Sequence, residues 1–366
     1  VNGVQFLAGE HAVDGVGGVF AYVSQLCNDM CDDFDVYMAY ALRPQTPKNY
    51  KEALDPRVHM IEVKNFGGSI LNPLQDLKVI AELRKIQKKI QPDVIHLHSS
   101  VAGGIGRIAF STCKDYQLVY TPHGYAHILM GKSSDKKCKI YKLFEQILGK
   151  RNCITLTCCE SEDEVAKTLT KRTAYVETGV NVSDLHATID PVQPEKQNKF
   201  TVYAMGRMCT QKQPSLFNKI AQLVPEARFV WIGNGELEHE LTAKNIEKTG
   251  WKPRHEAIAM GKGADIYILC SLGEAIAMSL IENMYMGVLC MVSNTMGNKS
   301  VIKDGINGFV CTTAEDYARR IKECMKQFPR QMAEQGRKDV LEHYNTERMK
   351  KDYVKFYYDA IAGKYN

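Results

Sequence analysis

Residues 266–292 read IYILCSLGEAIAMSLIENMYMGVLCMV and give the clearest indication of the architecture. Two runs of consecutive apolar residues, Ile266–Leu269 and Leu289–Val292, have the pattern of strands that are covered on both faces of a parallel sheet. The segment between them, Ala277–Met286, has the length and apolar spacing of a helix. A strand, a helix and another strand in this order predict a doubly wound α/β sheet.

The same alternation runs through most of the chain in two series of strands. Further helices are expected at Val19–Met30, Asp76–Lys89 and Pro214–Leu223. The expected strands of the first series are Val4–Leu7, Val36–Ala39, Val58–Val63, Val94–His98 and Leu118–Tyr120. Those of the second series, besides the two runs quoted above, are Phe200–Ala204, Phe229–Ile232 and Gly308–Val310.

A break in this rhythm predicts two domains. The stretch 182–198 contains Pro191 and Pro194 among charged residues and is interpreted as a linker. We therefore expect an N-terminal domain at 1–181 and a C-terminal domain at 199–345, which suits a chain of 366 residues. The tail, Thr346–Tyr365, has the pattern of a helix rich in aromatic residues, which must pack on one of the domains.

The composition is that of an ordinary globular protein, with 45% hydrophobic and 24% charged residues. Twelve cysteines are scattered without a Cys-x-x-Cys pair, which favours reduced core residues over metal ligands. The sequence shows neither a signal-peptide pattern nor an apolar run long enough to span a membrane. These features lead us to expect a cytoplasmic protein without a metal site.

Two carboxylates distinguish the opening stretch. Glu274 lies at the entrance of the expected helix, where the helix dipole favours a negative charge. Glu282 lies inside that helix beside Leu280 and Ile281, where a carboxylate costs free energy unless it has partners. Ribose or sugar hydroxyls are suitable partners, because they donate hydrogen bonds to an ionised carboxylate. Helix capping for Glu274 and a solvated face for Glu282 are the alternatives.

Two cations follow the expected strand Phe200–Ala204. Gly206 and Arg207 come soon after it, and Lys212 lies five residues further on. A glycine that allows close approach, two cations and the start of the next helix together describe a diphosphate site. Two solvated cations on a loop are the alternative, but the position at the carboxyl end of a parallel strand favours a binding role.

Two motifs of the first half also lie at expected sheet ends. The turn at Gly17 and Gly18 precedes a helix, so its backbone N–H groups could face an anion, although a third glycine of the pattern Gly-x-Gly-x-x-Gly is missing. His123 follows the strand Leu118–Tyr120 at the edge where ligands bind in such sheets. A plain turn and a structural histidine are the respective alternatives.

Taken together, these motifs resemble those of glycosyltransferase family 4. The carboxylates Glu274 and Glu282, with seven residues between them, resemble its Glu-x7-Glu signature, and Gly206-Arg207 with Lys212 resembles its phosphate element. The resemblance covers nearly the whole chain, because further elements occur in the family's order: Gly17-Gly18, Asp93–His98, His123-Gly124, Gly233–Gly235 and Asn307-Gly308.

The resemblance implies the GT-B fold, in which two Rossmann-like domains face a cleft and the last helix crosses back to the N-terminal domain. It also implies retaining, metal-independent transfer of a hexose-type sugar from a nucleotide diphosphate donor, with UDP as the expected nucleotide. The acceptor would be a saccharide or a lipid-linked molecule in surface polysaccharide or glycoconjugate synthesis. No cofactor beyond this nucleotide-sugar co-substrate is expected.

The resemblance also assigns roles to single residues. Arg207 and Lys212, beside Gly206, would neutralise the donor diphosphate, and Glu282 would bind the ribose hydroxyls. Glu274 would contact the donor sugar. Fixed cations suit this chemistry, because negative charge builds on the phosphate oxygens as the bond to the sugar breaks.

The remaining roles fall to one histidine and to backbone N–H groups. His123 would lie near the donor sugar. The N–H groups expected to meet sugar, phosphate or acceptor are those of Ala275, Ile276, Ala277, Gly17 and Gly18. Ala275 stands where the family usually has glycine, and Ser300 stands where it usually has an acid, so fine donor geometry is open to change.

The excess positive charge is concentrated in Lys132–Arg151, which holds seven basic and two acidic residues. One interpretation is contact with an anionic membrane, on the inner face and near a lipid-linked acceptor. The other is a solvated helix face packed on its own domain. No nucleic-acid partner is expected, because the segment lacks a reading motif. The expected apolar stripe beside the cations consists of Lys137, Ile140, Tyr141, Phe144, Ile147 and Leu148.

Three other functions were weighed against transfer. A UDP-sugar 2-epimerase of the same fold would need acid and base carboxylates on both sides of the sugar, and a non-catalytic nucleotide-sugar binder would need no chemistry at all. The sequence excludes neither the epimerase nor the non-catalytic binder. A nicotinamide oxidoreductase would need the pattern Gly-x-Gly-x-x-Gly with an acidic residue about 20 positions later, and that pair is not found.

Overall fold

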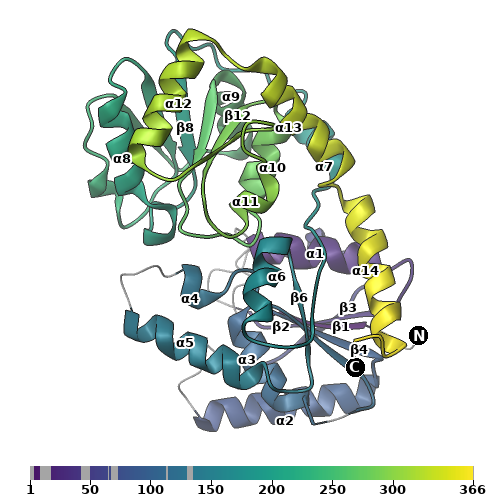
Figure 1. Ribbon diagram of the computed structural model, residues 1–366. Helices are drawn as coiled ribbons and strands as arrows, with labels where there is room; N and C mark the ends of the chain where they lie inside the picture. The colour runs from purple at the N-terminus through teal and green to yellow at the C-terminus, as the bar shows by residue number, and fades with distance from the viewer. Residues whose placement is uncertain are drawn as a thin grey trace. The chain divides into compact units, whose positions relative to one another are not determined.

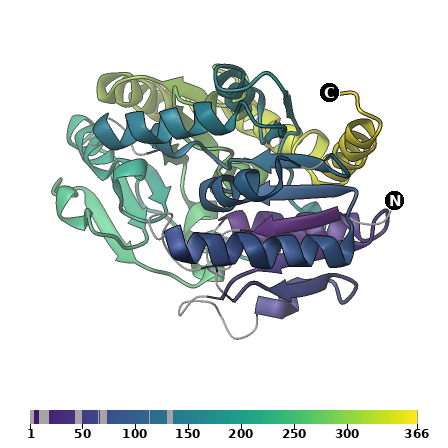
Figure 2. The ribbon, with the colours of Figure 1, turned by 90° about the horizontal axis from the view of Figure 1, so that it is seen from below.

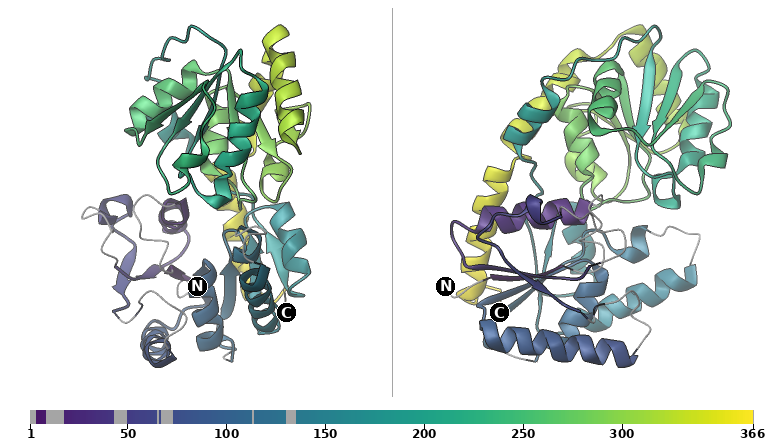
Figure 3. Two further views of the ribbon diagram at one scale, coloured as in Figure 1. Left: turned by 90° about the vertical axis from the view of Figure 1, so that its left-hand side faces the viewer. Right: turned by 180° about the vertical axis from the view of Figure 1, so that it is seen from behind.

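The computed structural model describes residues 4–8, 18–42, 50–64, 66, 73–112, 114–129 and 135–365. These residues fold into two units, each built on its own parallel sheet between layers of helices (Figures 1 and 3). The first unit extends to Glu177, apart from a short segment at 128–135, and takes in the chain again from Met349. The second unit comprises that short segment and Thr178–Arg348.

The first unit has a seven-stranded sheet in the order β3-β2-β1-β4-β5-β6-β7, with parallel neighbours. The strands are β1 (Val4–Ala8), β2 (Val36–Tyr40), β3 (His59–Glu62), β4 (Val94–His98), β5 (Gln117–Thr121), β6 (Ile154–Thr157) and β7 (Thr173–Tyr175). The helices are α1 (Gly18–Met30), η1 (Tyr50–Ala53), α2 (Pro73–Ile90), α3 (Ser100–Phe110) and α6 (Glu160–Lys167), together with the first half of α4 (Ala126–Leu129) and most of α5 (Asp135–Leu148) and α14 (Thr346–Ile361).

Strand β4 shows how the two faces of this sheet are covered, because successive side chains point to opposite faces. Ile95 and Leu97 belong to a core shared with α2 and α3 (Figure 2). His96, between them, contacts α14 through a hydrogen bond of 2.7 Å between its Nδ1 and the Tyr357 hydroxyl. The aromatic tail is thus a helix that packs on the first unit through Tyr353, Phe356 and Tyr357, which are buried, whereas Tyr358 is exposed.

A buried ion pair holds α5 against the rest of the first unit. Arg107 of α3 and Glu145 of α5 approach to 2.9 Å, and the Tyr120 hydroxyl donates to the other Glu145 oxygen at 3.1 Å. The guanidinium carbon also lies 4.0 Å from the centre of the Tyr120 ring. Because both charges are buried, each depends on its partners to offset the loss of solvation.

The second unit has a six-stranded parallel sheet in the order β10-β9-β8-β11-β12-β13. The strands are β8 (Thr201–Met205), β9 (Arg228–Ile232), β10 (Ile246–Gly250), β11 (Ile266–Leu269), β12 (Leu289–Ser293) and β13 (Phe309–Cys311). The helices are α7 (Val182–Ile189), η3 (Thr210–Lys212), α8 (Pro214–Leu223), η4 (Glu238–Glu240), α9 (Arg254–Gly263), α10 (Met278–Tyr285), α11 (Asn298–Val301), α12 (Ala314–Lys326) and α13 (Arg330–Glu342).

Two cores lie on opposite faces of this second sheet. One contains Phe217 of α8 and Tyr317 of α12, together with Trp231 of β9. The other contains Leu280 and Ile281 of α10, together with side chains of α7, α9 and α13. The residues that flank Glu282 are therefore core residues, which fixes the rotation of α10.

The structure confirms every strand and helix expected from consecutive or periodic apolar residues, and it adds β6, β7 and β10. Strand β10 escaped prediction because it is a polar edge strand, in which Glu247 and Lys248 are exposed. The expected linker is wrong in its first half. Its residues 182–189 form α7, whose Leu185 and Ile189 are buried.

Among the described helices, none combines the length and the apolar character that crossing a bilayer requires.

The buried ion pair of α5 leads to a stability prediction. Glu145→Ala leaves Arg107 buried without its counter-charge, so we expect the free energy of unfolding to fall by about 3–5 kcal/mol. Urea unfolding followed by circular dichroism measures this. Glu164→Ala, at an exposed position of α6, serves as the control and should cost less than about 1 kcal/mol. A loss at Glu145 no larger than the control would contradict the assigned role of the pair.

Candidate active site

The strand order of the second unit creates a place for a ligand. From β8 the chain continues outward through β9 to β10 at one edge, and it then returns to β11, which pairs with β8, before continuing to β12 and β13. The connections after β8 and β11 therefore leave the sheet in opposite directions. In open α/β sheets such a switch point, at the carboxyl ends of the strands, is where ligands bind.

The loop after β8 approaches its neighbours so closely that glycine is required. Gly206 has a φ of +137°, and its carbonyl accepts a hydrogen bond of 2.9 Å from the Trp231 indole. A Cβ on Gly233, in the turn after β9, would lie 2.3 Å from the Gly206 oxygen. The Gly233–Gly235 turn thus packs directly against the loop after β8, where a larger residue than glycine would clash.

Lys212 and Glu274 meet at the switch point. The Lys212 Nζ lies 2.6 Å from one Glu274 oxygen, and the Gln211 side-chain amide donates to the other at 3.2 Å. Both charged side chains are largely buried, with 19% and 11% of their surface exposed. The Leu272 N–H also donates to the Gln211 carbonyl at 2.9 Å, so backbone and side chains both join the two loops. Sequence reasoning named Lys212 and Glu274 and missed Gln211.

The segment after Glu274 leads directly into α10. Ala275 and Ile276 are half-buried and Ala277 is buried at the N-cap position, where no side chain caps the helix. A helix N-terminus carries partial positive charge and favours an anion. The three residues therefore lie immediately before the first helical residue, Met278, and their expected backbone role stays a prediction.

Glu282 has a cationic partner that the sequence did not reveal. Its Oε1 lies 3.0 Å from Nη2 of Arg254, the first residue of α9. The Glu282 side chain is 18% exposed, so it reaches the surface, whereas its neighbours Ile281 and Asn283 are buried. Trp251, three residues before Arg254, is 70% exposed. Because β10 was not recognised, the loop after it was not assigned to the ligand edge of the sheet, and both residues were missed.

Arg207 does not contact the Lys212–Glu274 pair. It is 74% exposed and lies 3.2 Å from Glu236 of the turn after β9. An exposed pair of this kind contributes roughly 0–1 kcal/mol, so Arg207 can exchange its partner at little cost. The structure therefore brings Lys212 and Glu274 together and gives Arg207 and Glu282 separate partners at the ends of other strands.

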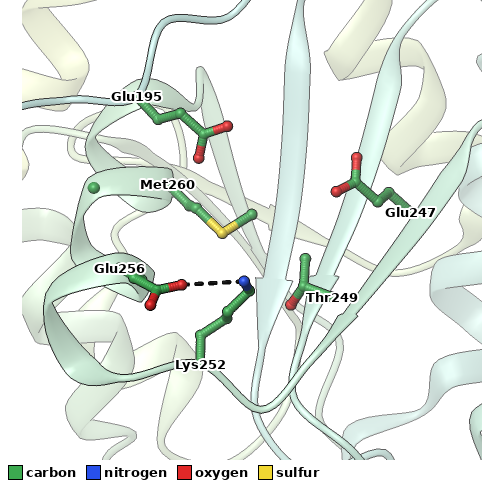
Figure 4. Close-up of a pocket in the computed structure, with 7 residues that line it drawn as sticks. Glu195, Glu247, Thr249, Lys252, Glu256 and Met260 are labelled. Atoms are coloured by element: carbon green, nitrogen blue, oxygen red, sulfur yellow. Dashed lines mark hydrogen bonds and ion pairs between the residues drawn. The ribbon is translucent and has the colours of Figure 1, made fainter.

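A cavity of the second unit lies away from these residues. It has a volume of about 540 Å³ and lies between β10 and α9, where Lys252 and Glu256 form an ion pair of 3.1 Å (Figure 4). None of the predicted donor residues lines it; its lining consists of Glu195, Glu247, Thr249, Lys252, Glu256, Ala259 and Met260. Within the described residues, no group of three or more His, Cys, Asp or Glu is placed to hold a metal ion.

In the first unit, His123 lies just after β5 in a left-handed backbone conformation, with a φ of +55°. Its Nε2 lies 2.9 Å from His98 Nδ1, and its Nδ1 lies 3.5 Å from the Cys158 sulfur. Burial lowers the pKa of His123 to about 3, so the imidazole is neutral near pH 7. His123 is therefore uncharged, and a hydrogen bond from its ring to a ligand would replace one of these two contacts.

A buried carboxylate holds the loop that carries His123. Glu162 of α6 accepts hydrogen bonds from the N–H groups of Gly124, at 2.6 Å, and Cys158, at 2.9 Å. Burial raises the pKa of Glu162 to about 7, although both hydrogen bonds act in the opposite direction. Sequence reasoning missed Glu162.

Of the glycine turn expected at Gly17 and Gly18, Gly18 is the first residue of α1, and Gly17 lies outside the described residues.

The raised pKa of Glu162 predicts a pH dependence of stability. Below the ordinary glutamate pKa of 4.5, both the folded and the unfolded state hold the proton. As pH rises from there to about 7, the unfolded state releases the proton first, so this residue's contribution to stability is lost. Glu162→Gln has no proton to release at this position. The free energy of unfolding of the variant, minus that of the wild type, should therefore increase as the pH rises across this window. Urea titrations at several pH values test this, and parallel curves for the two proteins would contradict it.

Comparison with known proteins gives matches along nearly the whole chain. The family described as Glycosyltransferase Family 4 matches residues 16–184, and the one described as Glycosyl transferases group 1 matches residues 186–339. The UDP-Gal:alpha-D-GlcNAc-diphosphoundecaprenol alpha-1,3-galactosyltransferase of Escherichia coli is 30% identical over 267 residues, which cover 65% of this chain and 67% of that protein. The N-acetyl-alpha-D-glucosaminyl L-malate synthase of Bacillus anthracis is 22% identical over 85% of this chain and 86% of its own length.

Solved structures share the fold at lower sequence identity. Sucrose-phosphate synthase (tll1590) from Thermosynechococcus elongatus superposes with a TM-score of 0.81 at 15% identity, over 99% of this chain and 100% of that one. Anabaena Alr3699/HepE, solved in complex with UDP and glucose, has a TM-score of 0.73 at 17% identity, over 96% and 98% of the two chains. These likenesses confirm the expected GT-B fold. With the family matches and the ordered motifs, they show that the chain is a member of glycosyltransferase family 4.

Proposed function

We propose that this glycosyltransferase moves a hexose-type sugar from a UDP-sugar to a saccharide or lipid-linked acceptor, with retention at the anomeric carbon and without a metal. The observation that carries the proposal is the contact of Lys212 with Glu274 at the switch point of the second sheet. One is the cation expected at the donor diphosphate, and the other is the carboxylate expected at the donor sugar. Their contact supports a single site for the sugar–phosphate bond.

The donor and acceptor classes draw support from the compared proteins. The name of the Escherichia coli relative states UDP-Gal as donor and a diphosphoundecaprenol-linked sugar as acceptor. Anabaena HepE was solved with UDP and with glucose. For this chain, a UDP-sugar and a polyprenyl-diphosphate-linked saccharide are accordingly the donor and acceptor to try first, in a role in surface polysaccharide or glycoconjugate synthesis.

The proposed mechanism concerns charge on the leaving group. As the bond between sugar and phosphate breaks, negative charge grows on the diphosphate, and Lys212 and Arg207 would stabilise it together with the start of α10. Lys212 would remain near Glu274 and hold that carboxylate oriented toward the sugar hydroxyls. We favour attack from the face of the departing diphosphate. His123 would supply a neutral hydrogen-bonding group to the sugar.

Nucleotide recognition would fall to Glu282 and the loop after β10. Glu282 is proposed to accept hydrogen bonds from the ribose hydroxyls and to exchange its contact with Arg254 in doing so. Trp251, with its exposed indole on the same loop as Arg254, offers a flat apolar surface for a base. Gly206 and the N–H groups of Ala275, Ile276 and Ala277 are proposed to meet the phosphates or the sugar, and Gly17 and Gly18 the phosphate or the acceptor.

Transfer is the direct test of this function. With a lipid-linked saccharide acceptor and a panel of radiolabelled nucleotide sugars, we expect a product with the anomeric configuration of the donor and a rate that EDTA leaves unchanged. Lys212→Gln should lower kcat/KM by roughly 100-fold or more, because a charge stabiliser of the leaving group is lost. Lys219→Gln, at an exposed position of α8, is the matched control and should be unaffected. An inverted product, or epimerised nucleotide sugar without transfer, would contradict the proposal.

The role of Glu282 is tested with two nucleotides. The wild type should bind UDP roughly 10–100-fold more tightly than 2′,3′-dideoxy-UDP, because hydrogen bonds to a charged group contribute about 1.5–3 kcal/mol. Glu282→Gln should lose most of this preference while binding the dideoxy compound as the wild type does. Isothermal titration calorimetry measures both affinities. Equal discrimination by the two proteins would exclude a ribose contact at Glu282.

A further inference from the structure

Helix α5 exposes a row of large apolar side chains. Ile140, Leu143 and Ile147 are 66%, 56% and 52% exposed. Their spacing of three and four residues places them on one face of the helix. Single exposed apolar side chains are common on protein surfaces, whereas three in one row form a continuous apolar surface that favours a partner.

The buried ion pair of the first unit fixes which face of α5 is turned outward. Glu145 points toward Arg107 and is buried, and Leu148 is 2% exposed. Phe144 is half-buried and lies against α3, where a Cβ on Gly104 would come within 3.2 Å of its ring. The stripe expected from sequence is therefore wrong in two of its members, because Phe144 and Leu148 pack inward. Leu143, which that stripe omitted, is exposed instead.

The same helix carries exposed positive charge. Its four lysines are all exposed, and Lys150 and Arg151 follow directly with exposed side chains. Its acidic residues are Asp135, at the first position, and Glu145, which is taken up by Arg107. The outward face of α5 is thus apolar and cationic. Its lysines are Lys136, Lys137, Lys139 and Lys142.

We propose that this face docks on a bilayer that contains anionic phospholipid. Ile140, Leu143 and Ile147 would enter the boundary between headgroups and acyl chains, and the lysines around them would lie against the negative headgroups. A second copy of the chain fits less well, because docking two such faces would place lysines against lysines. Charge complementarity therefore favours the membrane.

Docking through this surface would also determine where the enzyme meets its acceptor. Docking through α5 would hold the first unit at the membrane surface, where a lipid-linked acceptor presents its saccharide. That consequence rests on the proposed function. The docking itself does not, since it depends only on the exposed side chains of α5 and can be measured without donor or acceptor.

Vesicle flotation tests the proposal on the intact protein. With vesicles of phosphatidylcholine and about 30% phosphatidylglycerol, we expect the protein to float at low salt, to float less at high salt, and not to float with phosphatidylcholine alone. The apolar variant Ile140→Ser/Leu143→Ser/Ile147→Ser should bind the anionic vesicles at least about tenfold more weakly. Its matched control changes three exposed apolar residues of the second unit and should bind as the wild type does; these are Leu223→Ser, Ile306→Ser and Leu341→Ser.

A variant that removes positive charges from α5 tests the docking proposal independently. Lys136→Gln/Lys139→Gln/Lys142→Gln should weaken binding by about tenfold or more, because each lysine near an anionic surface adds to the affinity. The matched control removes three exposed lysines of the second unit, Lys219→Gln, Lys322→Gln and Lys326→Gln, and should have little effect. Thermal unfolding by circular dichroism ensures that only folded variants are compared.

The possible results separate docking from catalysis. Absence of flotation with anionic vesicles, or equal losses in the α5 variants and their controls, would overturn the proposal. So would a wild-type dimer that the apolar variant dissociates, combined with no vesicle binding, since a second copy would then be the partner. Flotation that depends on α5 in a protein that transfers no sugar would support docking and contradict the proposed function alone. The α5 variants should keep wild-type affinity for UDP.

Discussion

The contact between Lys212 and Glu274 is the interaction on which the account of this enzyme depends. It joins the loops after β8 and β11, the two central strands at which the second sheet changes direction. Gln211, the neighbour of Lys212, adds two hydrogen bonds to the loop after β11: its side chain donates to Glu274, and its carbonyl accepts from the Leu272 N–H. In the proposed site, a cation and a carboxylate held this closely would need little further ordering when the donor binds.

Around that contact, the second unit combines side chains fixed by core packing with exposed ion pairs that can exchange partners. Core packing of α10 fixes Glu282, whereas its partner Arg254 and the pair of Arg207 with Glu236 lie nearer to solvent. The first unit uses the same principle with different chemistry. Its buried carboxylates hold elements in place: Glu162 holds the His123 loop, and Glu145 holds α5. In both units, buried polar contacts hold loops and helices that carry candidate site residues.

Much of this could be predicted from sequence, and the failures have physical causes. Strands that are buried on both faces, such as Ile266–Leu269, can be predicted because their residues are apolar at consecutive positions. Glu274 and Glu282 could be recognised as a pair because they lie only eight residues apart in the sequence. Strand β10 could not be predicted, because an edge strand can be polar, and with it the loop carrying Trp251 and Arg254 was missed. Helix α7 was too short to give a clear period. Partners distant in the chain, such as Arg107 and Glu145, become visible only once the fold brings them together.

A crystal structure of the protein with UDP would show whether the donor binds at the switch point of the second sheet. We expect the diphosphate to lie within hydrogen-bonding distance of Lys212 and Arg207, and the ribose hydroxyls to contact Glu282 in place of Arg254. UDP bound elsewhere, with the contacts of Lys212 to Glu274 and of Arg254 to Glu282 unchanged and none of these side chains touching the nucleotide, would contradict this expectation.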